Sequence, residues 1–297
     1  MRMLVTGAAG FIGSNICLYL EKEGHNVLGT DNLSHGSKQN LEGFSGEFVS
    51  KELSKISASD IAGVDAVFHE AAISDPTFKD ENAIMETNLI QSKRIMEICV
   101  QKGVPFIYAS SAAVYGNTKL PNKEFEAEKP HNAYARSKLL LDLEAIKMRG
   151  SQVCGLRYFN VYGPGEQFKG SSASMVYHFM KDVLAGKNPV IFGDGKQKRD
   201  FVYVKDVVRA NMLALKSGKS AIVNVGSGKA TNFTDLVGAI SEKTGKKVKP
   251  IYKDNPFKEG YQYATEAELS LARETILYSP RWSLESGLMD YLSNLMA

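Results

Sequence analysis

The chain of 297 residues has only three cysteines, one tryptophan and no long apolar run. Cys17, Cys99 and Cys154 are odd in number and form no Cys-x-x-Cys or Cys/His group. We therefore expect buried thiols in a reducing compartment and no metal site. The apolar start, residues 1–6, has only the length of a strand, so neither a signal peptide nor a membrane anchor is expected. The expected location is the cytoplasm.

An excess of one charge sign is also missing. The 36 basic and 33 acidic residues leave a net charge of +3, which is too balanced to indicate a nucleic-acid partner. The hydrophobic fraction of 43% and the charged fraction of 23% are those of an ordinary globular protein. No repeat or low-complexity tract indicates a second, independent function.

What the sequence does contain is an alternation of short apolar runs with helix-like stretches. Strands are predicted at 3–6, 26–30, 47–49, 66–69, 106–109 and 153–158, and helices at 11–23, 82–102 and 132–149. A strand followed by a helix, repeated, predicts an α/β fold with a doubly wound parallel sheet of the Rossmann type.

The pattern loosens after residue 158, where Gly163, Pro164 and Gly165 interrupt it. A helix is predicted at 175–185, and strands that return to the sheet at 201–204 and 222–225. We therefore expect a dinucleotide-binding domain of residues 1–163 plus 199–225. A smaller, interleaved substrate-binding lobe is expected from residues 164–198 plus 226–297.

Three glycines, Gly7, Gly10 and Gly13, lie between the first predicted strand and the first predicted helix. A pyrophosphate binds bare backbone amides at a helix N-terminus, and glycine allows that close approach. The spacing differs by one residue from the commoner G-x-G-x-x-G, and three glycines could also form a plain tight turn. The order of strand, loop and helix favours a dinucleotide site.

Asp31 ends the second predicted strand, where a carboxylate can accept hydrogen bonds from the adenosine ribose. This position favours NAD. A turn-forming aspartate ahead of Asn32 is the other interpretation. Lys38 is close enough in sequence to reach a 2′-phosphate, so NADP remains open.

A tyrosine and a lysine four residues apart on a helix share one face and can do acid/base work. The spacing occurs at Tyr115/Lys119, Tyr134/Lys138 and Tyr177/Lys181. Only Tyr134 falls in the first turn of a helix that starts at the carboxyl edge of the predicted sheet, as the glycine loop does. We expect the Lys138 ammonium and a cationic nicotinamide to lower the pKa of Tyr134. Ser111 ends a strand at this edge and can share the substrate proton, or it can cap a turn.

Several sequence blocks occur in an order typical of one known family. They are Thr6–Gly13, Phe68-His69-Glu70-Ala71-Ala72, Asn88, residues 109–116, Tyr134-x-x-x-Lys138, residues 157–164 and Arg199-Asp200-Phe201-Val202-Tyr203-Val204. The chain resembles the extended short-chain dehydrogenase/reductase family, and within it the nucleotide-sugar epimerases.

The resemblance implies Ser111, Tyr134 and Lys138 as the catalytic set, with Asn88 supporting the active-site helix. It implies that Asn160 and Arg199 hold a substrate diphosphate, although Arg199 alone could be an exposed basic residue. The tightly bound NAD or NADP is expected to contact Gly7, Gly10, Phe11, Ile12, Gly13, Asp31, Asn32, Lys38, Ala71, Asn88, Tyr134 and Lys138. Pairing of helices 82–102 and 132–149 in a homo-oligomer, at least a dimer, is implied as well.

The resemblance also bears on the reaction. Ala112 and Ala113 stand where dehydratases of the family carry an Asp-Glu pair, which favours epimerisation through a keto sugar. Residues 162–174 and 260–262 are similar to the ADP-glycero-manno-heptose 6-epimerases, whose second proposed acid/base corresponds to Lys169.

In that subfamily Ser171 and Tyr261 would also contact substrate; Lys169 could instead be a solvated loop lysine. UDP-glucose and UDP-N-acetylhexosamine 4-epimerases share most of the motifs. A net oxidoreductase that releases reduced cofactor and a non-catalytic dinucleotide sensor are the remaining alternatives.

Overall fold

The central feature of the computed structural model, which describes residues 1–75, 78–255 and 262–296, is a seven-stranded sheet. Its strands are β1 (Arg2–Thr6), β2 (Asn26–Asp31), β3 (Glu47–Ser50), β4 (Ala66–His69), β5 (Phe106–Ser111), β6 (Val153–Tyr158) and β10 (Ala221–Val225). They lie in the order β10-β6-β5-β4-β1-β2-β3, and every neighbouring pair is parallel. The predicted doubly wound α/β fold is confirmed.

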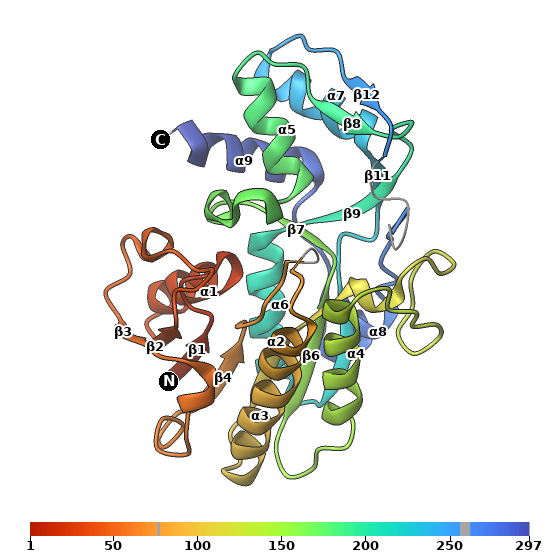
Figure 1. Cartoon of the computed structure of the whole chain (residues 1–297). Helices are drawn as coiled ribbons and strands as arrows, with labels where there is room; N and C mark the ends of the chain where they lie inside the picture. The colour runs from red at the N-terminus through yellow and green to blue at the C-terminus, as the bar shows by residue number, and fades with distance from the viewer. Residues whose placement is uncertain (76–77, 256–261, 297) are drawn as a thin grey trace.

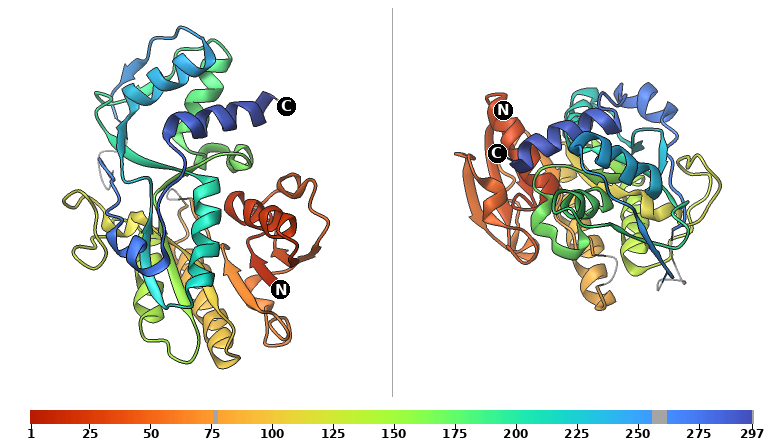
Figure 2. Two further views of the ribbon diagram at one scale, coloured as in Figure 1. Left: turned by 180° about the vertical axis from the view of Figure 1, so that it is seen from behind. Right: turned by 90° about the horizontal axis from the view of Figure 1, so that it is seen from above.

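Helices cover both faces of this sheet, which explains why β4, β5 and β6 are buried along their whole length. One face packs against α1 (Phe11–Lys22), α6 (Val204–Ser217) and α8 (Ser270–Ile276). The other packs against α3 (Ser92–Gln101) and α4 (Ala133–Ala145). Figure 1 shows α3 and α4 side by side in front of the sheet, and Figure 2 shows α1 and α6 from behind.

The helix predicted at 82–102 is divided into three segments. α2 (Glu81–Met85) leads into a π-helical segment, η3 (Glu86–Gln91), and α3 follows without a break. The wider hydrogen-bond register of the π-helix coincides with Asn88, whose buried side chain bonds outside the helix. The sequence pattern alone did not predict this local change of register.

The prediction that the strand at 201–204 returns to the main sheet is wrong. β9 (Lys198–Tyr203) instead pairs with β7 (Asn160–Tyr162) and β11 (Ala230–Asn232) in a separate three-stranded sheet. Of residues 199–225, only β10 joins the main sheet, and the intervening α6 was not predicted. The β-branched and aromatic run at 201–204 favours a strand by propensity, which hides the start of α6 at Val204.

The remaining elements gather at the top of Figure 1. They are α5 (Met175–Leu184), α7 (Phe233–Thr244), α9 (Leu284–Met296) and a two-stranded sheet of β8 (Val190–Phe192) and β12 (Ile251–Lys253). Phe179, Leu236 and Tyr291 are buried in an apolar core between these helices. Short 3-10 turns complete the fold: η1 (Lys38–Leu41), η2 (Leu53–Lys55), η4 (Ala112–Tyr115) and η5 (Glu166–Ser172). Within the described residues, no helix combines the length and the apolar character needed to cross a bilayer.

Candidate active site

A cleft of about 1150 Å³ opens between the carboxyl edge of the main sheet and the η5 segment. Its lining includes the glycine loop, the end of β5, the start of α4 and residues 168–175. Pockets for one drug-sized ligand have volumes of roughly 300–1000 Å³. This cleft is therefore large enough for a dinucleotide together with a second ligand.

The glycine loop forms one wall of the cleft, and its backbone fits the dinucleotide expectation. Gly7 has φ of 69°, and a Cβ there would lie 2.6 Å from the Ala71 backbone nitrogen. A Cβ on Gly13 would overlap the Gly7 carbonyl oxygen. Only glycine allows β1, α1 and the loop after β4 to come this close, which leaves the N-terminus of α1 open to an anion. Phe11, Ile12 and Ala71 line the same wall.

Asp31 lies at the far end of this wall, with its side chain fixed by two backbone amides. Oδ2 accepts from Ala9 N at 3.1 Å, and Oδ1 accepts from Leu33 N at 2.7 Å. Burial raises the pKa of Asp31, yet each oxygen keeps a lone pair for a ribose hydroxyl. Asn32 lines the cleft beside it, whereas Lys38 is absent from the lining and its Nζ lies 6.0 Å from the Phe48 ring centroid.

Ser111, Tyr134 and Lys138 all line the cleft at the carboxyl edge of β5. Ser111 ends β5, and its Oγ accepts from Ala113 N at 3.1 Å. Tyr134 lies in the first turn of α4, which is capped by Asn132. The buried Lys138 side chain donates from Nζ to the Ala109 carbonyl oxygen at 2.7 Å. The three residues thus meet as the sequence predicts.

Burial and neighbouring charges shift the pKa values of Tyr134 and Lys138. Burial raises the pKa of Tyr134, a hydrogen bond with Ser111 lowers it, and Glu70 raises it further. Without a cationic nicotinamide the pKa of Tyr134 is therefore raised, and its lowering by Lys138 together with that ligand stays a prediction. Burial lowers the pKa of Lys138 to about 8, although Glu70 and Asp142 oppose that shift. A cationic ligand beside Tyr134 would supply the missing stabilisation of the phenolate.

Of the three Tyr-x-x-x-Lys pairs, only Tyr134/Lys138 has both members in the cleft lining. Tyr115 is buried elsewhere; its hydroxyl donates to Asn224 Oδ1 at 2.7 Å and accepts from Arg157 at 3.0 Å. Tyr177 lies on α5, outside the lining. The choice that we made from helix position agrees with the geometry.

Asn88 does not line the cleft, contrary to the expected cofactor contact. It is fully buried; its Oδ1 accepts from Ile73 N at 2.8 Å, and its Nδ2 donates to the Ile73 carbonyl oxygen and to Ser137 Oγ. Asn88 therefore joins the loop after β4 to α4, which is the supporting position that the resemblance implies.

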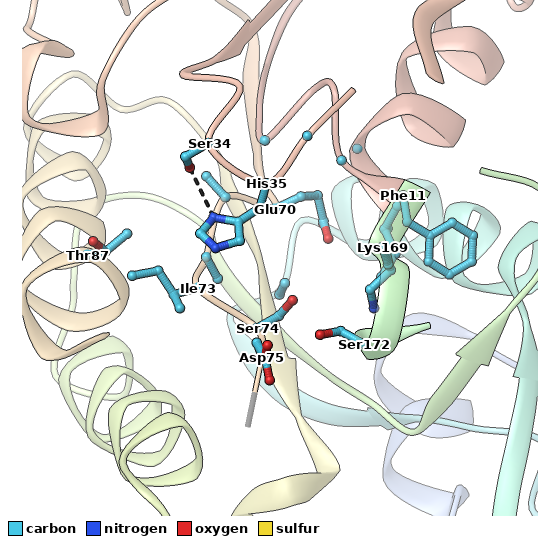
Figure 3. Close-up of a pocket in the computed structure, with 18 of the residues that line it drawn as sticks. Phe11, Ser34, His35, Glu70, Ile73, Ser74, Asp75, Thr87, Lys169 and Ser172 are labelled. Atoms are coloured by element: carbon cyan, nitrogen blue, oxygen red, sulfur yellow. Dashed lines mark hydrogen bonds between the residues drawn. The ribbon is translucent and has the colours of Figure 1, made fainter. Parts of the chain in front are cut away.

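Lys169 reaches the cleft from η5, on the lobe side. Figure 3 shows its side chain beside the Phe11 ring and near Asp75, and its Nζ lies 5.8 Å from the ring centroid. Burial lowers the pKa of Lys169, while Glu166 and Asp75 raise it. The buried Glu166 accepts from Gly163 N and from Ser174 Oγ, both at 3.0 Å, and so fixes the segment that carries Lys169. Lys169 is therefore half-buried in the wall of the cleft.

Only some of the residues that were expected to contact the substrate line the cleft. Asn160 and Ser171 line the cleft, and Asn160 Oδ1 accepts from Thr265 Oγ1 at 3.1 Å. Arg199 is outside the lining: its guanidinium lies over the Phe233 ring at 5.6 Å and donates to the backbone. Tyr261 lies outside the described residues.

Glu70 is a cleft residue that sequence reasoning did not assign. It follows β4 directly, and its Oε1 accepts from the Tyr158 hydroxyl at 2.9 Å. Burial raises the pKa of Glu70 to about 7, while Tyr158 and Lys138 lower it. The sequence signal that could have identified Glu70 was an acidic residue directly after the buried strand at 66–69.

A parallel Rossmann sheet with a glycine loop and a Ser/Tyr/Lys group facing one cleft defines a dinucleotide-dependent enzyme of the short-chain dehydrogenase/reductase type. Residues 3–226 match the model of the NAD dependent epimerase/dehydratase family. The chain belongs to this family, and it is a carbohydrate epimerase of the NAD-dependent nucleotide-sugar group.

Three solved structures resemble it over nearly its whole length. An ADP-L-glycero-D-manno-heptose-6-epimerase from Helicobacter pylori is 36% identical, with a TM-score of 0.93 and coverage of 100% of this chain and 96% of that chain. A UDP-glucose 4-epimerase from Thermotoga maritima, solved with UDP-glucose, is 32% identical, with a TM-score of 0.91 and coverage of 100% and 99%. A UDP-glucuronic acid 4-epimerase from Bacillus cereus, solved with its nucleotide sugar and NAD, is 28% identical, with a TM-score of 0.87 and coverage of 99% and 100%.

Proposed function

We propose that this chain interconverts the epimers of an ADP-linked glycero-manno-heptose at carbon 6, with a tightly bound NAD(P). The observation that carries this proposal is Lys169, a half-buried ammonium that lines the cleft from the lobe side while Tyr134 lines it from α4. Similarity to the Helicobacter pylori heptose epimerase supports this substrate.

In the proposed reaction, the Tyr134 phenolate takes the proton of the sugar hydroxyl, and Ser111 shares that proton. A nicotinamide held beside Tyr134 would supply the hydride acceptor at the sugar carbon and the hydride donor for its return. The Lys138 ammonium stabilises the phenolate, and Lys169 exchanges a proton with the keto sugar from the opposite side. Two acid/base groups on facing walls allow the sugar to be handled from both sides.

The residues at the end of β5 support epimerisation over dehydration. Ala112, which is buried, and Ala113 follow Ser111 and supply no carboxylate for the removal of water. We propose that Asn160, Ser171 and Arg199 contact the substrate, with Arg199 turning toward its diphosphate. The fixed Asp31 carboxylate supports NAD over NADP, because a 2′-phosphate there would meet a negative charge.

The test is to incubate the purified protein with ADP-glycero-manno-heptose and, separately, with UDP-glucose, and to detect the epimer by NMR. Turnover of the heptose alone is expected. Turnover of UDP-glucose alone would replace this proposal with a 4-epimerase, and stoichiometric release of reduced cofactor would indicate a net oxidoreductase.

A matched pair of lysine variants tests Lys169. Lys169→Ala should lower heptose turnover by about 10²-fold, the lower range for a general acid/base group. The control is Lys181→Ala, which removes an exposed lysine from the same lobe. Equal rates for both variants would remove Lys169 from the mechanism.

We also propose a homodimer built through the helices around α3 and α4. Ile90, Leu140, Leu143 and Ile146 are apolar, yet 39–50% of each side chain is exposed. A second copy covering them would bury this surface. Sedimentation should give a dimer for the wild type and a monomer for Leu143→Glu; a monomeric wild type would refute the dimer.

The free, buried Cys17, Cys99 and Cys154 support a cytoplasmic location, which fractionation of cells would test.

A further inference from the structure

Glu70 occupies a position between the two ends of the cleft. It follows β4, and a Cβ on Gly7 would lie 2.9 Å from the Glu70 carbonyl carbon. Its side chain raises the pKa of Tyr134 and of Lys138, which line the other end of the cleft. A dinucleotide that extends from the glycine loop to Tyr134 therefore has to pass beside Glu70.

The carboxyl group of Glu70 is held in a fixed position. The Tyr158 hydroxyl donates to its Oε1 at 2.9 Å, and that hydroxyl in turn accepts from Asn211 Nδ2 at 2.8 Å. Asn211 is fully buried on α6, and its Nδ2 also donates to the Val207 carbonyl oxygen. A chain of hydrogen bonds thus runs from α6 through β6 to Glu70. Figure 3 shows Glu70 among the residues that line the cleft.

The charged neighbour of Glu70 is Lys138, which is itself committed to the Ala109 carbonyl oxygen. Tyr134 and Tyr158 are the other titratable groups that face Glu70, from α4 and from β6. Because His69 bonds to Thr6 and Ser92 instead, it does not share this role. One carboxylate therefore faces one ammonium and two hydroxyls in a partly enclosed cleft.

We propose that the Glu70 carboxylate makes the cleft prefer the oxidised form of the nicotinamide over the reduced form. The oxidised ring carries one more positive charge than the reduced ring, so the Glu70 carboxylate, which is ionised above its pKa of about 7, acts on that form alone. The inference rests on the proposed function, because Tyr134 and Lys138 set where the reacting ring lies. An enzyme that must begin each cycle by removing a hydride benefits from holding its cofactor oxidised between turnovers.

The size of the effect follows from Coulomb's law. At an effective dielectric constant of about 20, one unit charge about 12 Å away changes an affinity ratio by about tenfold, and a nearer charge changes it by more. Glu70→Gln keeps the shape of the side chain and a hydrogen-bond acceptor for Tyr158 but removes the charge. The relative affinity for the two cofactor forms should therefore move by about tenfold or more toward the reduced form.

The experiment equilibrates each protein with an equal mixture of NAD⁺ and NADH, isolates the complex by gel filtration, and measures the bound ratio after extraction. The control is Glu52→Gln, which removes a carboxylate from the other end of the same cleft, beside Asn32. This variant should change the binding of both forms equally, so its bound ratio stays at the wild-type value.

Tyr158→Phe is the second variant and decides the question if Glu70→Gln does not fold. It removes the donor that favours the Glu70 carboxylate, so the ratio should move toward the reduced form by a smaller factor. An unchanged ratio in Glu70→Gln, or an equal shift in Glu52→Gln, overturns the inference. A shift in Glu70→Gln together with a wild type that epimerises no sugar would refute the proposed function and leave this inference standing.

Discussion

The Nε of Arg157 donates to Oδ2 of Asp142 at 2.9 Å, and both side chains are only 1% exposed. Asp142 lies one turn beyond Lys138 on α4, and it also accepts from the Tyr108 hydroxyl at 2.8 Å and from Ser110 Oγ at 3.0 Å. This buried network ties the catalytic helix to β5 and β6.

Breaking this pair should cost stability. Arg157→Met leaves the Asp142 carboxylate buried without its cation, and the free energy of unfolding should fall by about 3–5 kcal/mol. Urea unfolding followed by circular dichroism measures it. The control is Lys123→Ala, which breaks the exposed pair with Glu126 and should leave the midpoint unchanged. Equal midpoints for the two variants would mean that the buried pair adds nothing.

Replacing Tyr134 by Phe should lower epimerisation by about 10³-fold, because the acid/base hydroxyl is removed. The bound cofactor should remain, since the glycine loop is untouched. NMR detection of the epimer and extraction of the cofactor measure the two effects. Tyr177→Phe is the control, because it removes a tyrosine of the same spacing outside the cleft. Sustained turnover by Tyr134→Phe would sink the proposed mechanism.

The rate should fall at alkaline pH as Lys138 loses its proton. Its pKa is lowered to about 8, so the ammonium is present below that pH and is lost above it. The fold should persist in this range: between pH 8 and 10.5 the unfolded chain binds more protons, so stability rises with pH. Steady-state rates together with circular dichroism from neutral to alkaline pH separate the two effects.

Glu70→Gln provides a check on this pH dependence. The Glu70 carboxylate raises the pKa of Lys138, so its removal should move the alkaline fall in rate to lower pH. A fall at an unchanged pH would mean that another group controls the alkaline limb.

The cofactor preference should depend on Asp31. Asp31→Ala removes both a charged acceptor and the negative charge facing a 2′-phosphate, so affinity for NAD should fall by about tenfold or more while affinity for NADP stays the same or rises. Titrations that follow cofactor fluorescence measure both affinities. Lys38→Ala is the matched variant, and it should change neither affinity because Lys38 is absent from the cleft lining. A selective loss of NADP binding in Lys38→Ala would restore its role at a 2′-phosphate.

Much of the fold could be predicted because local patterns and long-range order agree in the first 158 residues. The strand predicted at residues 153–158 is a mostly apolar run that contains Arg157, and the structure has the same bounds. The strand β9 and the helix α6 meet without a turn between Tyr203 and Val204, so no glycine or proline marks the boundary. The pairing of β9 within the small sheet depends on β7 and β11, which are distant from it in sequence.

The site was predictable where a motif fixes spacing, as it does for Tyr134 and Lys138. Glu70 lies in the block Phe68–Ala72, but the block assigns its carboxylate no role, and Glu166 is a single carboxylate whose position depends on tertiary contacts. Arg199 shows the same limit. Its sequence block is recognisable, but the block does not give the direction of the side chain, and the guanidinium lies over Phe233 in the structure. The raised pKa of Tyr134 in the protein without a nicotinamide could not be predicted, because its largest cause is burial, which the sequence does not quantify.

The small sheet has a consequence for engineering by recombination. β7 and β9 precede β10 in the chain, whereas β11 follows it, and Thr231 pairs with Arg199 across the β9–β11 register. A chimera joined to a relative at a single crossover after residue 226 would combine strands from two parents within one three-stranded sheet. Exchange of sugar specificity between relatives would therefore require a crossover before residue 160, or a pair of crossovers, so that β7, β9 and β11 come from the same parent.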